Sequence, residues 1–239
     1  MPDLTDPDNL SNIVAYHQDG PVALVTMDDS RVNALGLAMQ AALTAAFDRA
    51  EADSEIRAVV LAGRPGRFSG GFDLGLIRSG DTEAIKAMVR GGGNFIRRLY
   101  GSSLPVVAAC TGHAVAAGAL MLLGCDVRVG PATPGAVKIG LNEVAIGLTL
   151  PPWALAIARE RLSPRHRQRS VVNGRLYDGP GAIEAGFLDQ VVAPEIVVAE
   201  AMAEARVLAA LDPAAYQTTV QQFRGAVLAE MVGSSVAGA

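Results

Sequence analysis

The chain has 239 residues, half of them hydrophobic and 18% charged, and its formal net charge at pH 7 is −4. This composition excludes an intrinsically disordered protein and a nucleic-acid surface built on bulk positive charge. Cys110 and Cys125 lie in apolar stretches and are too few for a disulfide framework, so we expect buried free thiols in a reducing compartment. The acidic first ten residues show no secretory or transit signal, which favours a cytoplasmic location.

Strand and helix signals alternate through the first part of the chain. Residues 13–17 and 22–27 predict two strands joined by an Asp-Gly-Pro turn, and residues 33–52 predict a helix with apolar side chains at helical spacing. Further buried strands are predicted at residues 58–61, 106–109 and 127–129. Strands that alternate with helices place the chain in the α/β class with parallel pairing.

One uncharged stretch, residues 99–125, is longer than the roughly 20 residues that span a bilayer. It contains proline, several glycines and His113, lacks an aromatic belt, and has arginines at both ends. We therefore expect a buried strand at residues 105–110, a turn, and a short helix of small residues, and not a membrane span.

The composition becomes helical after Pro151. Helices are predicted at residues 153–161, 164–172, 179–185 and 194–210, and residues 213–230 are amphipathic. We divide the chain near residue 193 into an α/β core, residues 1–193, and a C-terminal helical region, residues 194–239. The three glycines at 91–93 interrupt a helical pattern, and we expect a flexible loop or a mobile pocket edge there.

Two glycine-containing bends follow predicted strands. The bend at residues 64–74 frees backbone N–H groups that can face an anion, although an ordinary strand-to-helix loop has the same features. It fits neither the phosphate-loop nor the dinucleotide pattern. The second bend, residues 111–126, leads to the N-terminus of a buried helix, where free N–H groups favour negative charge; tight helix packing is the alternative, and His113 is expected to be structural.

A lone carboxylate, Glu143, lies in an otherwise uncharged run from residue 139 to residue 158. Desolvation among apolar neighbours raises the pKa of a carboxyl group and suits it to act as a base near neutral pH. A helix-start carboxylate is the alternative.

These three segments, in this order, resemble the crotonase superfamily, the enoyl-CoA hydratase and isomerase group. The residues that carry the resemblance are the early motif Val-Asn-Ala-Leu at 32–35, Phe-Ser-Gly-Gly-Phe-Asp-Leu at 68–74, the segment 110–126, and Leu-Asp-Gln-Val-Val at 188–192. The run 139–147, with Pro151 and Trp153, is most similar to the Δ3,Δ2-enoyl-CoA isomerases. The resemblance implies a ClpP/crotonase-like spiral of ββα units with C-terminal helices that form a trimer or a dimer of trimers.

The resemblance also implies the site. The amides of Phe72 and Ala117 would hold the thioester oxygen of an acyl-CoA, and Glu143 would be the catalytic base. No cofactor is expected beyond the coenzyme A of the substrate, and no metal. Residues expected to line the substrate are Arg31, Asn33, Ala34, Leu35, Gly70, Gly71, Asp73, Leu74, Leu120 and Trp153.

The departures from the family pattern favour one reaction. Hydratases of the family carry a second glutamate three residues after the second oxyanion position, where this chain has Leu120. One base suffices to move a double bond, so we expect a 3-enoyl-CoA to be converted to the 2-trans isomer. The alternatives are a catalytically weak acyl-CoA-binding protein, and a hydratase or thioester hydrolase with a substituted acid.

Basic side chains outside these segments suggest contacts with coenzyme A phosphates. The stretch from Arg159 to Arg169 is better explained as a solvated helix face or a subunit contact, and Arg31, just before the early motif, is the better-placed candidate. Neither nucleic acid nor a membrane is an expected partner.

Overall fold

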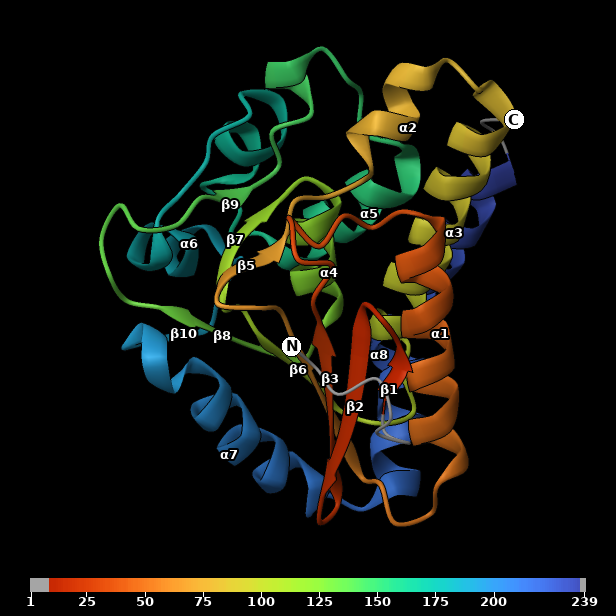
Figure 1. Cartoon of the computed structure of the whole chain (residues 1–239), viewed down its shortest axis with the longest axis vertical. Coiled ribbons are helices and arrows are strands. Elements are labelled where there is room, and N and C mark those ends of the chain that lie inside the picture. The colour runs from red at the N-terminus through yellow and green to blue at the C-terminus, as the bar shows by residue number, and fades with distance from the viewer. Residues whose placement is uncertain (1–8, 237–239) are drawn as a thin grey trace.

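The computed structural model describes residues 9–236, which form two sheets with helices around them (Figure 1). The large sheet has the order β1-β2-β3-β4-β6-β8-β10, and its strands are parallel from β3 onward. These strands are β1 (Asn9–Ser11), β2 (Val14–Asp19), β3 (Val22–Met27), β4 (Ala58–Ala62), β6 (Val106–Ala109), β8 (Val127–Pro131) and β10 (Gln190–Val192). The small sheet has the order β5-β7-β9 and consists of β5 (Gly66–Ser69), β7 (Gly112–Val115) and β9 (Ile139–Gly140).

The two sheets are connected three times in the same way. β4, β6 and β8 of the large sheet lead into β5, β7 and β9 of the small one, and both sets pair in parallel. The backbones of β5 and β7 approach so closely that Gly112 has no room for a side chain. A Cβ atom there would lie 1.9 Å from the carbonyl carbon of Gly66. The repeated strand pair places successive bends at one end of the large sheet.

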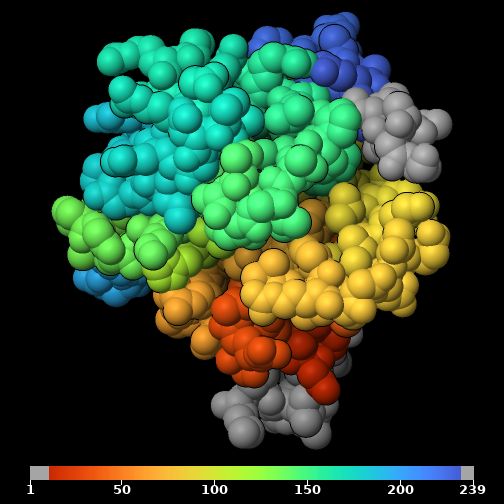
Figure 2. All heavy atoms as spheres, turned by 90° about the horizontal axis from the view of Figure 1, so that it is seen from above, coloured from red at the N-terminus to blue at the C-terminus, as the bar shows by residue number. Residues whose placement is uncertain are grey.

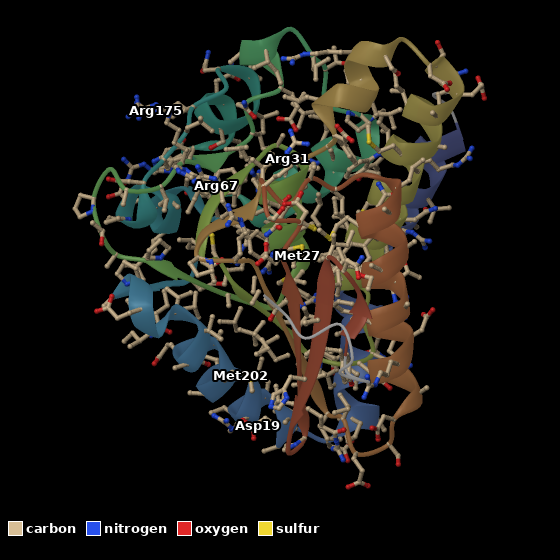
Figure 3. The ribbon with its side chains drawn as sticks, in the orientation of Figure 1. Asp19, Met27, Arg31, Arg67, Arg175 and Met202 are labelled. Carbon is tan, nitrogen blue, oxygen red and sulfur yellow. The ribbon has the colours of Figure 1, made fainter. Side chains whose placement is uncertain are left out.

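Helices cover both faces of the large sheet. The helices are α1 (Leu37–Ala52), α2 (Leu74–Ser79), α3 (Thr82–Tyr100), α4 (Ala117–Gly124), α5 (Pro152–Arg161), α6 (Gly179–Ala185), α7 (Val197–Ala209) and α8 (Pro213–Val236), with short 3-10 turns η1 (Val144–Ile146) and η3 (Pro194–Ile196). The larger core contains apolar side chains of α1, α3, α4 and α5. α7 covers the other face with residues at helical spacing, among them Ala201, Met202 and Ala205 (Figure 3).

Several predicted boundaries are wrong. The first long helix starts at Leu37 and not at residue 33, because Asn33 has a φ of +52°, which no right-handed helix accommodates. The three glycines at 91–93 lie inside α3 and not in a loop. In place of a helix at 164–172, only η2 (Gln168–Val172) forms, as a single π-helical turn, and the helix predicted from residue 194 begins as η3.

The uncharged stretch at residues 99–125 contains the predicted buried strand, β6, and the predicted short helix, α4, but the segment expected to form only a turn between them also forms a second strand, β7. In the described part of the chain, no helix combines the length and the apolar character that a membrane crossing requires. Cys110 and Cys125 are free and buried, and their burial raises the pKa of each thiol to about 12. The division of the chain at residue 193 stays a prediction; α7 packs on the large sheet, and α8 packs on α5 and α3.

Candidate active site

The early motif at residues 32–35 is fastened to β5 by Asn33. This side chain is fully buried, and its Nδ2 donates to the carbonyl oxygens of Met27 and Phe68 at 3.0 and 3.1 Å. Asp29 holds the other side of the loop, because its carboxylate accepts the amides of Asn33 and Ala34 at 2.8 and 3.0 Å. Asn33 was expected to line the substrate; its polar groups instead bond the protein, which fixes the motif at the carboxyl end of β3.

The first bend continues directly from this loop. The Gly70 amide donates to the Val32 carbonyl at 2.7 Å, and the Leu35 amide donates to the Gly71 carbonyl at 2.8 Å. Gly71 has a φ of +86°, which favours glycine. Among the described residues, the N–H of Phe72 has no hydrogen-bond acceptor. The carbonyl side of the peptide between Gly71 and Phe72 is therefore held by protein, and its N–H is free to bind a ligand.

The second bend supplies an equivalent amide. Ala116 precedes α4 with a φ of +52° and a ψ of −125°, a backbone conformation that costs a residue with a side chain about 1–3 kcal/mol. Its amide donates to the Gly140 carbonyl at 3.0 Å, and the next amide, that of Ala117, has no acceptor in residues 9–236. Strain of this kind concentrates at functional sites.

The two bends are in direct contact. A Cβ atom on Gly71 would lie 2.8 Å from the Ala116 Cβ and 3.2 Å from the Ala117 nitrogen, and one on Gly118 would lie 2.3 Å from the Ser69 carbonyl oxygen. The Ala117 amide opens α4, whose dipole favours negative charge at this end. The structure thus brings the two predicted oxyanion segments together.

Glu143 follows the third strand of the small sheet. β9 pairs with β7, and the Gly140 carbonyl accepts a hydrogen bond from the Ala116 amide. The segment that carries Glu143 therefore begins next to the second bend. The side chain of Glu143 is 9% exposed, and its Oε2 is buried with no hydrogen-bond partner among the described residues. Burial raises the pKa of this carboxyl group to about 7, as the sequence predicts for a lone acid among apolar neighbours. Such a group is half ionised at neutral pH.

Two of the other predicted residues belong to the apolar core. Leu120 is 1% exposed and lies on α4, one turn after Ala117. Trp153 is 3% exposed, and its indole packs on α3, where a Cβ atom on Gly93 would lie 2.8 Å from the indole Cε2. The indole of Trp153 therefore lies between its own helix, α5, and α3, and it does not line the cavity beside the first bend.

A cavity of about 530 Å³ opens beside the first bend. Six of the predicted residues line it: Arg31, Ala34, Gly70, Phe72, Asp73 and Leu74. The remaining seven do not: Asn33, Leu35, Gly71, Ala117, Leu120, Glu143 and Trp153. Figure 2 shows this face of the molecule, on which the yellow residues of α2 and α3 lie between the red and orange N-terminal residues and the green segment after β9.

Two polar residues of this cavity behave differently. Asp73 caps α2, because its Oδ1 accepts the amide of Gly75 at 2.8 Å, so its carboxylate is already used by the fold. Arg31 is exposed, and its guanidinium has no ion pair or hydrogen bond within the described residues. Figure 3 shows Arg31 and Arg67 near Met27, at the carboxyl end of β3, whereas Asp19 lies at the opposite end of the sheet. Arg31 is thus available to an anionic ligand.

Part of the basic stretch from Arg159 to Arg169 makes contacts within the protein, whereas Arg165 and Arg169 are exposed. Arg159 pairs with Glu230 at 2.6 Å, and Arg161 donates to the Cys125 carbonyl at 2.8 Å. His113, expected to be structural, accepts the Lys138 amide through Nδ1 at 2.9 Å, and its burial lowers its pKa. No group of three or more metal-binding side chains occurs in the part of the chain that the structure describes.

A model of the enoyl-CoA hydratase/isomerase family matches residues 17–234. The chain therefore belongs to this family of enzymes, which act on acyl-CoA thioesters, and the predicted crotonase-like α/β fold with C-terminal helices is confirmed.

Its relatives include both isomerases and hydratases. Human mitochondrial enoyl-CoA delta isomerase 1 is 30% identical over 212 residues, which cover 88% of this chain and 70% of the human protein. The solved structure of EchA3 from Mycobacterium tuberculosis, a probable enoyl-CoA hydratase, is 40% identical with a TM-score of 0.90 and covers 93% of each chain. The solved human mitochondrial Δ3-Δ2-enoyl-CoA isomerase is 30% identical with a TM-score of 0.87 and covers 92% of this chain and 86% of that one.

Sequence reasoning missed one polar residue beside the site, Gln40. It follows Met39 in α1 and is only 7% exposed. A glutamine next to the apolar positions of an alanine-rich helix is the signal that points to it, because a buried amide needs hydrogen-bond partners.

Proposed function

We propose that this enzyme moves the double bond of a 3-enoyl-CoA to the 2-trans position. The observation that carries the proposal is the buried carboxyl group of Glu143, with one oxygen unpartnered and a pKa raised to about 7 by burial. A base in this state accepts and returns a proton near neutral pH.

The proposed reaction needs one base and one anion site. Glu143 takes a proton from C2, and the electron pair of that C–H bond moves into the thioester, which forms a dienolate. The amides of Phe72 and Ala117 hold the negative oxygen of the dienolate. The protonated Glu143 then returns the proton to C4, the double bond forms between C2 and C3, and the carboxylate is regenerated. Loss of one such amide donor costs an enzyme roughly 3–4 kcal/mol of transition-state stabilisation.

The apolar character of the site favours isomerisation over hydration. Hydration requires a positioned water and a second acid or base, and Leu120 occupies the position where hydratases of the family carry their second glutamate. The side chain of Leu120 is buried and offers water no hydrogen bond. A dry site also protects a dienolate from side reactions.

The direct test is conversion of a 3-enoyl-CoA by the purified protein, followed by mass spectrometry in ¹⁸O-labelled water. Isomerisation incorporates no oxygen, whereas hydration and thioester hydrolysis do. We expect Glu143→Gln to lose about 10²-fold or more in kcat, and Glu184→Gln, an exposed glutamate of α6, to retain wild-type activity. Equal activity of Glu143→Gln and wild type would refute the assignment of the base, and acyl-CoA binding without turnover would leave a binding protein.

We further propose that the protein needs no cofactor beyond the coenzyme A of its substrate and that Arg31 contacts a phosphate of that group. We also propose that the enzyme is cytoplasmic, without nucleic-acid or membrane partners.

We propose that the protein forms a trimer or a dimer of trimers. The C-terminal helices support an assembly, because they expose the apolar side chains of Val207 and Phe223 at 66% and 76%. A solution mass that corresponds to a monomer would contradict this assembly.

A further inference from the structure

The peptide between Gly71 and Phe72 is held through its carbonyl group. The Leu35 amide donates to the Gly71 oxygen at 2.8 Å. Because the peptide is planar and trans, its N–H, which belongs to Phe72, points away from that carbonyl. The group that holds Leu35 therefore sets the direction of the Phe72 N–H.

Gln40 holds Leu35. Its Nε2 donates to the carbonyl oxygen of Leu35 at 3.0 Å and to that of Met88 in α3 at 2.9 Å. Both hydrogens of the buried side-chain amide are thus used, one on each segment. A continuous series of hydrogen bonds leads from α3 through Gln40 and Leu35 to the peptide of Phe72.

The glycines of α3 make room for this arrangement. A Cβ atom on Gly91 would lie 2.3 Å from the Gln40 Oε1, and one on Gly92 would lie 2.4 and 2.8 Å from Cε1 and Cζ of Phe72. A glycine inside a helix costs about 1 kcal/mol relative to alanine. Here the cost is offset by close contact, because the side chain of Gln40 and the ring of Phe72 rest directly on the helix backbone.

We propose that Gln40 is a positioning residue, which, together with the contact of Phe72 on Gly92, aims the Phe72 amide at the thioester oxygen. This inference rests on the acyl-CoA site proposed above. Gln40 touches neither the substrate nor the base; it acts through Leu35.

The first test compares Gln40→Met with Gln221→Met, the same change at an exposed position of α8. Methionine fills the space of glutamine but donates no hydrogen bond. Removal of an oxyanion-hole donor lowers kcat by about 10²- to 10³-fold. Gln40→Met only misdirects the donor, so we expect kcat to fall about tenfold and KM to change less than about threefold. The infrared carbonyl stretch of bound 2-enoyl-CoA, labelled with ¹³C at the thioester, should move toward the value of the free thioester. Gln221→Met should change neither quantity.

The second test remains informative if Gln40→Met folds poorly. Gly92→Ala should lower kcat, and adding Phe72→Leu should restore part of it, because leucine lacks the Cε1 and Cζ atoms that the new methyl group meets. Gly225→Ala is the matched control, since a Cβ atom on this helical glycine has nothing within 4 Å. An unchanged kcat and carbonyl frequency in Gln40→Met, or no recovery in the double variant, would overturn the inference.

The infrared measurement separates this inference from the proposed reaction. A wild-type protein that binds 2-enoyl-CoA but isomerises nothing refutes the isomerase proposal. In that case the shift of the infrared carbonyl frequency in Gln40→Met still tests the positioning role of Gln40. A wild-type protein that binds no acyl-CoA refutes both.

Discussion

The burial of Glu143 makes the stability of this protein depend on pH. The carboxyl group has a pKa of about 7 in the folded chain and an ordinary value of 4.5. Between these two values the unfolded chain has released the proton and the folded chain still holds it, so stability falls as pH rises from about 4.5 to 7. Each pKa unit corresponds to about 1.4 kcal/mol, so the full loss is about 3 kcal/mol.

Glu143→Gln removes this titration and keeps the size of the side chain. We expect the free energy of unfolding of the variant, minus that of the wild type, to increase by about 2.5 kcal/mol between pH 5 and pH 8. Urea unfolding at a series of pH values and one fixed protein concentration measures this difference, because oligomers unfold in a concentration-dependent way. A difference that stays constant with pH would show that the carboxyl of Glu143 is solvated in the folded protein.

Three further predictions concern the site. The kcat/KM for a 3-enoyl-CoA should rise with pH and reach half its maximum near pH 7, since the base must be ionised; a flat profile from pH 5 to 9 would exclude Glu143 as that base. Gly71→Ala should abolish activity and lower the melting temperature, because its φ is +86° and the new methyl group would lie 2.8 Å from the Ala116 Cβ, whereas Gly225→Ala should raise the melting temperature slightly. Asn33→Ala should cost about 3 kcal/mol in chemical denaturation, because it leaves buried carbonyl groups unpaired; a cost below about 1 kcal/mol would contradict its anchoring role.

Local sequence patterns predicted strands β2, β3, β4, β6 and β8, several of the helices and the raised pKa of the candidate base, but not the small sheet β5-β7-β9. The strands β4 and β6 are short runs of apolar residues and β3 is nearly so, which is typical of buried parallel strands. Glu143 is the lone acid of a long uncharged run, so its desolvation and raised pKa follow from its neighbours in the chain. These features depend on residues that lie close together in sequence.

Other features depend on segments that meet only in the folded protein. The glycines at 91–93 lower helix propensity, yet α3 continues through them, because Gln40, Phe72 and Trp153 come from three other segments and pack where side chains would otherwise be. Asp73 was expected to bind the substrate; it lines the cavity, but its carboxylate caps α2. The buried strands of the large sheet, the family motifs and the lone acid were thus contained in the sequence. The small sheet and the direction of the Phe72 N–H were decided by packing between distant segments, since strand pairing and hydrogen-bond direction depend on relative position in space.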